Sequence, residues 1–378
     1  MNPAHRSPAL FVGLSIFFTF FLSGCGALVT YEVSQREHVR AATDLKPDLA
    51  QDRFLVDMAK RYGLMALFAQ TAYRKDLKVE ERDDKACDYL YASKPGAQTA
   101  ALMHMPRSPD GKGGWVRYQL ASPMPKGDPG QPCVNTGNGL FYETYVHKAA
   151  DGNVTKAVIA FRGTENRSGQ WFWDWKTNLT AAFGFEPAQY QYVRERLPAL
   201  IEALKRDLGP AIKIYAVGHS LGGGLAQLAA YASKDVEEAY IFNASPVTGW
   251  TWVAKDGKDG RAFQPYPRIH RITQGGEALE VPRFAASLVT NPRFGRHDVR
   301  IHFDDTVEEK RGDHSMQLLA CGFAELLLKK DAADAEHDYP LQFIADNVLA
   351  SALVQGMKPS QAWEMSPGAT SRVCDIKK

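Results

Sequence analysis

Ser220 stands in the motif Gly-His-Ser-Leu-Gly, residues 218–222, between an apolar run and a helix-like run. The run before it, residues 212–217, is rich in strand-forming residues, and the leucines after it recur at helical spacing. Such a strand–turn–helix presents a serine hydroxyl on a strained turn, and Gly218 and Gly222 leave room for the strand and the helix to approach each other. We therefore predict that Ser220 is a nucleophile.

A serine hydroxyl attacks only when a base removes its proton, and folds with this turn place an acid and then the base further along the chain. Of the later histidines, His270 lies inside an expected strand, and His297 and His302 flank or lie within the next one. His314 falls in the loop between that strand and a helix, at the edge where catalytic loops gather. The predicted base is His314.

The third member of such a site is a carboxylate that orients the base. Glu277 and Glu280 follow an expected strand, where a turn would present a carboxylate on the same edge of the sheet. Glu277 is the first choice and Glu280 the second. Asp304 and Asp305 also follow a strand and precede the base, so the sequence leaves the acid open.

Acyl transfer also needs hydrogen-bond donors where negative charge develops on the tetrahedral intermediate. Enzymes with this turn use the N–H of the residue after the nucleophile, here Leu221, and one from a loop after an earlier strand. Residues 158–164 supply such a strand and loop. Thr164 at its end can contribute its hydroxyl as well as its N–H.

Around the expected oxyanion loop and Ser220, the chain resembles the class 3 lipase family. The sequences FRGT at residues 161–164 and VGHSLGG at residues 217–223 are similar to two motifs of that family. The sequence WDWKTNL at residues 173–179 resembles the segment that follows its oxyanion strand. The resemblance covers about residues 140–330.

The resemblance implies an α/β-hydrolase fold in which Ser220 is the nucleophile, His314 the base and Thr164 an oxyanion residue. The family usually places an Asp as the third member, within an Asp-x-Val-Pro-like stretch. This chain instead has EALEVP at residues 277–282. A Glu can orient a His equally well.

The elements that must position these residues alternate between strand and helix. We expect strands at residues 140–146, 154–161, 212–217, 238–242, 268–273 and 299–303. We expect helices at residues 188–208, 220–233, 315–330 and 340–354. This alternation, with strands too apolar for one solvated face, predicts an α/β protein with a mostly parallel, α/β-hydrolase-like sheet flanked by helices.

The chain before this region is less regular. A helix is expected from about Leu55 through Tyr73, followed by a loop-rich insertion with short hairpins at residues 75–139. Four cysteines, Cys87, Cys133, Cys321 and Cys374, allow two disulfides in three alternative pairings. In one of these, Cys87 pairs with Cys133 inside the insertion and Cys321 pairs with Cys374. Their spacing is not that of a metal or redox motif.

The N-terminus carries an apolar run at residues 9–22, which is short for a membrane span, followed by Leu-Ser-Gly and Cys25. This stretch resembles the lipobox of bacterial lipoproteins, which implies a signal peptide at residues 1–24 and a lipid on Cys25. A tether at residues 25–46 and one hydrolase domain at residues 47–378 would follow. Gly26, in place of an Asp, favours the outer membrane of the cell envelope.

The composition excludes some functions. A formal net charge of +2 gives no general attraction to nucleic acid or to anionic membranes. We expect no metal and no cofactor, and membrane contact only through the acylated cysteine and local apolar surface. The sequence predicts a serine hydrolase that cleaves carboxylic esters of lipids. A small-ester esterase, an acyltransferase on the same fold and an inactive binding module remain alternatives.

Overall fold

The computed structural model of the chain describes residues 49–74, 77, 81–82, 85–90, 114–120, 125, 127–136, 139–149, 151–164, 186–258, 263–275, 277, 279, 283, 296–301 and 314–329. The expected signal peptide, the tether and the helix at residues 340–354 lie outside these residues.

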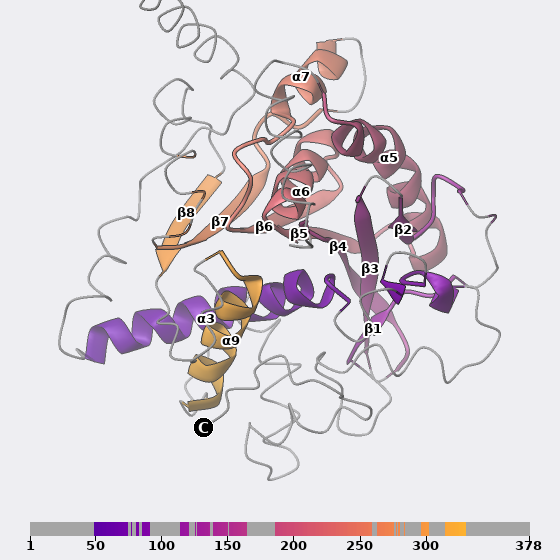
Figure 1. Cartoon of the computed structure of the whole chain (residues 1–378). Coiled ribbons are helices and arrows are strands. Elements are labelled where there is room, and N and C mark those ends of the chain that lie inside the picture. Colours follow the sequence, from indigo (N-terminus) through magenta and orange to yellow (C-terminus); the bar gives the residue numbers. More distant parts are fainter. Residues whose placement is uncertain are drawn as a thin grey trace, which may run out of the picture.

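Within the described residues, eight strands form one mixed sheet (Figure 1). β3 (Phe141–Lys148) pairs antiparallel with β4 (Val154–Phe161). From β4 onward each neighbour is parallel, in the order β5 (Lys213–His219), β6 (Val236–Phe242), β7 (Arg268–Gln274) and β8 (Arg296–Ile301). The predicted α/β architecture with a mostly parallel sheet is confirmed. The carboxyl ends of the parallel strands therefore share one edge, where the loops after them meet.

The described part of the loop-rich stretch extends this sheet. β1 (Gly114–Arg117) and β2 (Cys133–Asn135) both pair antiparallel with β3. A disulfide joins Cys133 of β2 to Cys87, just before the short 3-10 helix η3 (Asp88–Leu90). This is one of the pairings that the sequence left open, and the side chains of the other two cysteines lie outside the described residues.

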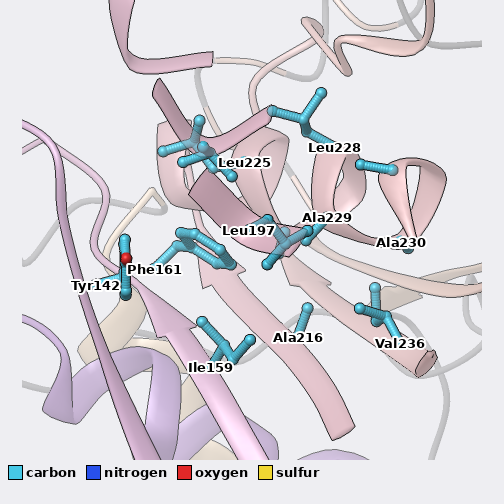
Figure 2. Packing of buried hydrophobic residues seen from close by; sticks show 14 of the residues in the cluster. Tyr142, Ile159, Phe161, Leu197, Ala216, Leu225, Leu228, Ala229, Ala230 and Val236 are labelled. Atoms are coloured by element: carbon cyan, nitrogen blue, oxygen red, sulfur yellow. The ribbon is translucent and has the colours of Figure 1, made fainter. Parts of the chain in front are cut away.

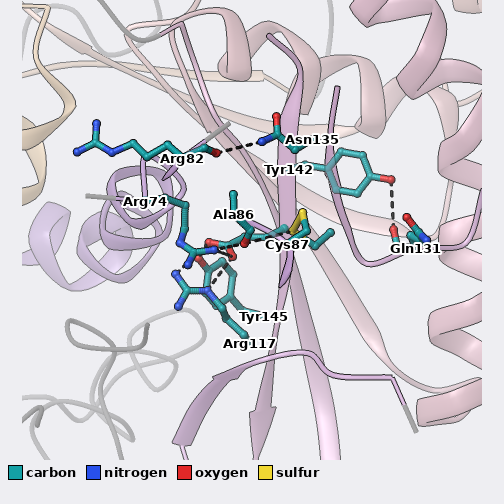
Figure 3. The surroundings of a disulfide bond; sticks show 11 residues. Arg74, Arg82, Ala86, Cys87, Arg117, Gln131, Asn135, Tyr142 and Tyr145 are labelled. Atoms are coloured by element: carbon teal, nitrogen blue, oxygen red, sulfur yellow. Dashed lines mark hydrogen bonds and ion pairs between the residues drawn. A yellow bond between two sulfur atoms is a disulfide. The ribbon is translucent and has the colours of Figure 1, made fainter. Parts of the chain in front are cut away.

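A buried group of charges lies beside this disulfide (Figure 3). The carboxylate of Glu143 on β3 accepts a hydrogen bond of 2.7 Å from Arg117 Nε, and Arg74 Nη1 lies 3.7 Å from it. The hydroxyl of Tyr145 donates to the same carboxylate, and Arg74 also donates to the carbonyl of Ala86. A buried carboxylate needs such partners. The contacts fix the chain after residue 71 against the edge of the sheet.

Helices cover both faces of the sheet (Figure 1). One face carries α3 (Leu49–Thr71) and α9 (Met316–Lys329), which also pack on each other. The other face carries α5 (Ala188–Leu208), α6 (Leu221–Ala232) and α7 (Trp250–Lys258), of which α7 lies where the sequence predicted no element. Among the described residues, no helix is both long and apolar enough to cross a membrane.

The core against α6 explains why this helix is rigidly placed. All of its residues are buried, and Leu225 and Leu228 pack with Leu197 of α5 over Ile159 and Ala216 of the sheet (Figure 2). Full burial of one leucine or isoleucine side chain contributes about 1.5–3 kcal/mol to folding. The start of α6, and with it the turn before it, is consequently held by the centre of the core.

Candidate active site

Ser220 occupies the turn between β5 and α6, in a backbone conformation that few non-glycine residues adopt. Its φ is 55° and its ψ is −123°. The turn is fixed from the next strand, because Ser220 N–H donates to the carbonyl of Phe242 at 3.0 Å and its own carbonyl accepts from Ser245 N–H at 2.9 Å. Such backbone strain persists only where the surroundings determine it, and it is common at functional sites. The half-buried hydroxyl is thereby presented at the carboxyl edge of the sheet.

Three glycines let the backbone approach this turn closely. A Cβ atom on Gly218 would collide with the backbone of Gly222, and one on Gly222 would collide with the carbonyl of Phe161. A Cβ atom on Gly163 would lie 3.1 Å from Ser220 Cβ. The strand, the helix and the loop after β4 therefore meet at Ser220 without intervening side chains. The sequence predicted the close approach of the strand and the helix, and the structure adds that of the loop.

His314 lies between Ser220 and Glu277. Its Nε2 is 2.9 Å from Ser220 Oγ, and its Nδ1 is 2.6 Å from Glu277 Oε2. An ionised carboxylate only accepts, so Nδ1–H donates to Glu277, which leaves Nε2 free to accept from the serine hydroxyl. Residues that are distant in the sequence form one continuous hydrogen-bonded chain.

The carboxylate of Glu277 is fully buried and has further partners. Its Oε2 accepts a hydrogen bond of 2.9 Å from Leu279 N–H, and it forms an ion pair with Arg283. Arg283 is itself buried and donates from Nη1 to the carbonyl of Ala244 at 2.7 Å. The buried negative charge is therefore compensated and its position fixed.

A second set of hydrogen bonds reaches His314 from its backbone side. His219, the residue before Ser220, is buried, and its Nε2 lies 2.8 Å from the carbonyl oxygen of His314. Its Nδ1 lies 2.6 Å from the hydroxyl of Tyr73, which follows α3. Burial lowers the pKa of His219 well below 6.5, and a protonated His314 would lower it further. This imidazole is therefore neutral at physiological pH.

The expected oxyanion residues border the same place. Leu221 is the first residue of α6, directly after Ser220. Thr164 is half-buried in the loop after β4, next to the glycine that lies against Ser220 Cβ. The roles of their N–H groups remain predictions.

The other sequence candidates lie elsewhere. His270 lies inside β7, where its Nε2 is 3.1 Å from Glu238 Oε2 near the amino ends of the strands, and His297 is its register partner on β8. Glu280, Asp305 and Cys25 lie outside the described residues. In the part of the chain that is described, no cluster of three or more histidine, cysteine, aspartate or glutamate side chains could bind a metal ion.

Sequence reasoning missed three residues of this arrangement: Tyr73, His219 and Arg283. His219 is part of the serine motif and Arg283 directly follows Val-Pro, so both stood beside residues already singled out. No sequence pattern indicated that Tyr73 belongs to the site, because its contact with His219 joins residues 146 positions apart.

Comparisons with known proteins match part of this chain. Residues 90–264 match the model of the phospholipase-like family described as the Tle-like phospholipase domain. The matched segment is similar to that family and makes up less than half of the chain. It contains Ser220 and Thr164, whereas Glu277 and His314 lie beyond it.

A stretch of 173 residues is 38% identical to the extracellular phospholipase A1 of Serratia liquefaciens. It covers 43% of this chain and 50% of that protein, so the chain spans about half the length of this curated relative. Together the two matches support a relationship of this part of the chain to lipases and phospholipases.

Proposed function

We propose that this protein hydrolyses carboxylic esters of phospholipids through an acyl-enzyme. The observation that carries the proposal is the hydrogen-bonded chain Ser220–His314–Glu277, with the serine on a strained turn. The phospholipid substrate class is supported by the family match and by the partial identity to a phospholipase A1.

In the proposed reaction, Ser220 Oγ attacks the ester carbonyl while its proton passes to His314 Nε2. Glu277 stabilises the imidazolium that forms and keeps its Nδ1 proton in place. The N–H groups of Leu221 and Thr164 donate to the oxyanion. The imidazolium then protonates the leaving alcohol, and a water activated by the same base releases the fatty acid and restores the serine.

The same comparison and the N-terminal sequence support a proposed location for the protein. The relative is named as extracellular, and the lipobox-like stretch ends at Cys25. We propose that this chain is exported and acylated on Cys25, so that its site works at a membrane of the cell envelope, with the outer membrane favoured by Gly26. Two or more acyl chains give stable anchoring where one does not.

The test combines a covalent probe with two substrates. A fluorophosphonate should label the wild type and not Ser220→Ala, and the wild type should release fatty acid from phospholipid vesicles faster than from short p-nitrophenyl esters. His314→Ala should lower kcat by several orders of magnitude, and His297→Ala is the matched control with near-normal turnover.

Labelling that persists in Ser220→Ala would remove the serine from the proposal. Preference for short esters would indicate the esterase alternative, and acyl transfer to an added alcohol in place of hydrolysis would indicate an acyltransferase. A wild type that binds vesicles but neither reacts with the probe nor hydrolyses any ester would indicate a binding module.

A further inference from the structure

His219 is the least expected member of the site, because its side chain points at neither the nucleophile nor the acid. It is 4% exposed, and its two ring nitrogens lie 2.8 Å from the carbonyl of His314 and 2.6 Å from the hydroxyl of Tyr73. A buried imidazole with both nitrogens paired occupies one defined orientation.

The chemistry of the partners fixes the tautomer of His219. A backbone carbonyl can only accept, so Nε2 must carry the proton that it donates to His314. The lowered pKa keeps the ring neutral, so Nδ1 is an acceptor and the hydroxyl of Tyr73 donates to it. The hydrogen bonds therefore run in one direction, from Tyr73 through His219 to the backbone of His314.

We propose that His219 and Tyr73 are positioning residues for the base, and that they fix the backbone of His314 as Glu277 fixes its ring. This inference rests on the proposed function, in which His314 is the base. His219 directly precedes Ser220 at the end of β5, so the same strand end carries the nucleophile and the donor that locates the base. The link thereby sets the separation between Ser220 Oγ and His314 Nε2.

The placement of His314 shows why such a link is needed. His314 precedes α9 in a turn, and Met316 is the first helical residue. Its ring is one-third exposed, so packing alone does not locate it. Displacement of a reacting group by about 1 Å can cost roughly 100-fold in rate. A hydrogen bond to its carbonyl removes the freedom that the turn would otherwise have.

Tyr73 also lies close to Gly163, in the loop after β4 that leads to Thr164. A Cβ atom on Gly163 would lie 2.5 Å from the Tyr73 hydroxyl and 2.5 Å from the His219 carbonyl oxygen. The hydroxyl therefore lies where the loop before Thr164, the strand end and the turn of His314 come together. The Tyr73 hydroxyl thereby links the loop of the oxyanion residue Thr164 to the turn of the base His314.

Three substitutions at residue 219 distinguish the effect of losing the hydrogen bond to His314 from the effect of losing side-chain volume. The amide nitrogen of a glutamine reaches the place of Nε2 and can donate to the His314 carbonyl, whereas an asparagine reaches only the place of Nδ1. We expect His219→Gln to keep kcat within about 5-fold of the wild type, and His219→Asn and His219→Ala to lose about 100-fold, with KM within about 2-fold throughout. The rate of fluorophosphonate labelling should follow kcat.

Tyr73→Phe, which removes only the donor to Nδ1, should lower kcat by about 3- to 10-fold. Tyr240→Phe is its matched control, since it also deletes one buried hydroxyl, which donates to Glu238 at 2.6 Å near the amino ends of the strands. It should lose a similar amount of stability and keep wild-type turnover. Thermal unfolding of each variant, followed by circular dichroism, shows that it is folded.

Equal kcat values in all three variants of residue 219, or a loss in His219→Gln as large as in His219→Ala, would overturn the inference. An inactive wild type would contradict the proposed function instead. ¹⁵N NMR of the histidine rings tests the inference without turnover: a His219 ring that is neutral below pH 6.5, with its proton on Nε2, supports it. A protonated ring or a proton on Nδ1 overturns it.

Discussion

The proposed acid of this site is Glu277, whose carboxylate has three separate contacts. It accepts from His314 Nδ1 at 2.6 Å, it accepts from Leu279 N–H at 2.9 Å, and it neutralises the buried Arg283. A glutamate side chain is one methylene longer than an aspartate, and the extra hydrogen bond and ion pair remove the freedom that this length would add. The site therefore accommodates a Glu by fixing its head group from several sides.

Glu277→Gln should lower kcat by about 10²–10⁴-fold with little change in KM, because the amide no longer stabilises the imidazolium and can bind the wrong tautomer. It should also reduce stability, because a buried arginine loses its counter-charge. Steady-state kinetics on phospholipid vesicles, together with thermal unfolding, measure both effects. Glu277→Asp keeps the charge and should lie between the wild type and Glu277→Gln.

Full activity of Glu277→Gln would contradict this assignment. The same measurement on Glu280→Gln and Asp305→Asn would then identify the acid among the alternatives that the sequence left open.

At the scale of elements, the site depends on how closely α6 approaches β4. Gly222 is the second residue of α6, and a Cβ atom there would collide with the Phe161 carbonyl on β4. The apolar core on the other side of α6 prevents the helix from retreating. A side chain at residue 222 must therefore displace the helix, the loop after β4 or both.

Gly222→Ala should accordingly destabilise the protein by about 2 kcal/mol or more, because overpacking a rigid core costs about 1–3 kcal/mol and occasionally more. It should also reduce activity, since the helix begins directly after Ser220, the proposed nucleophile. Gly152→Ala is the matched control: Gly152 has a φ of +85° with no atom within 4 Å of an added Cβ. That substitution meets only the conformational cost, about 1 kcal/mol. Equal losses of stability in chemical denaturation would contradict the steric argument.

At the scale of the whole molecule, the buried hydrogen bonds join parts that are distant in the chain. Tyr73 follows α3, His219 ends β5 and His314 precedes α9, so one neutral imidazole connects the end of a strand to segments beside two helices that cover the same face of the sheet. The pKa of His219 is lowered in the folded state. Below about pH 6.5 the unfolded chain binds a proton on this residue that the folded protein does not bind, so stability falls as the pH falls.

The melting temperature should therefore decrease from pH 7 to pH 5, and this decrease should be smaller in His219→Gln, which has no titrating group at that position. Tyr240→Phe keeps His219 and should show the slope of the wild type. Differential scanning fluorimetry across this range measures all three proteins. An unchanged slope in His219→Gln would indicate that other groups cause the acid sensitivity.

Much of this arrangement followed from the sequence alone. The glycine spacing around Ser220, the strand before it and the leucine pattern after it identify the turn because they are local: each depends on residues a few positions apart. The helix at residues 188–208 and the strand at residues 154–161 agree with α5 and β4 for the same reason. The sequence pattern also predicted that His314 directly precedes a helix.

The tertiary structure decided which of these residues meet. Glu277 contacts His314 across 37 positions, and Tyr73 contacts His219 across 146. No local periodicity records such distances, since they depend on strand order, register and the packing of α3 and α9 on one face. Short strands such as β1 and β2 form for a similar reason, because their hydrogen bonds come from β3 and not from their own sequence. The sequence determined the chemistry available to this protein, and the packing of distant segments determined which groups can act together.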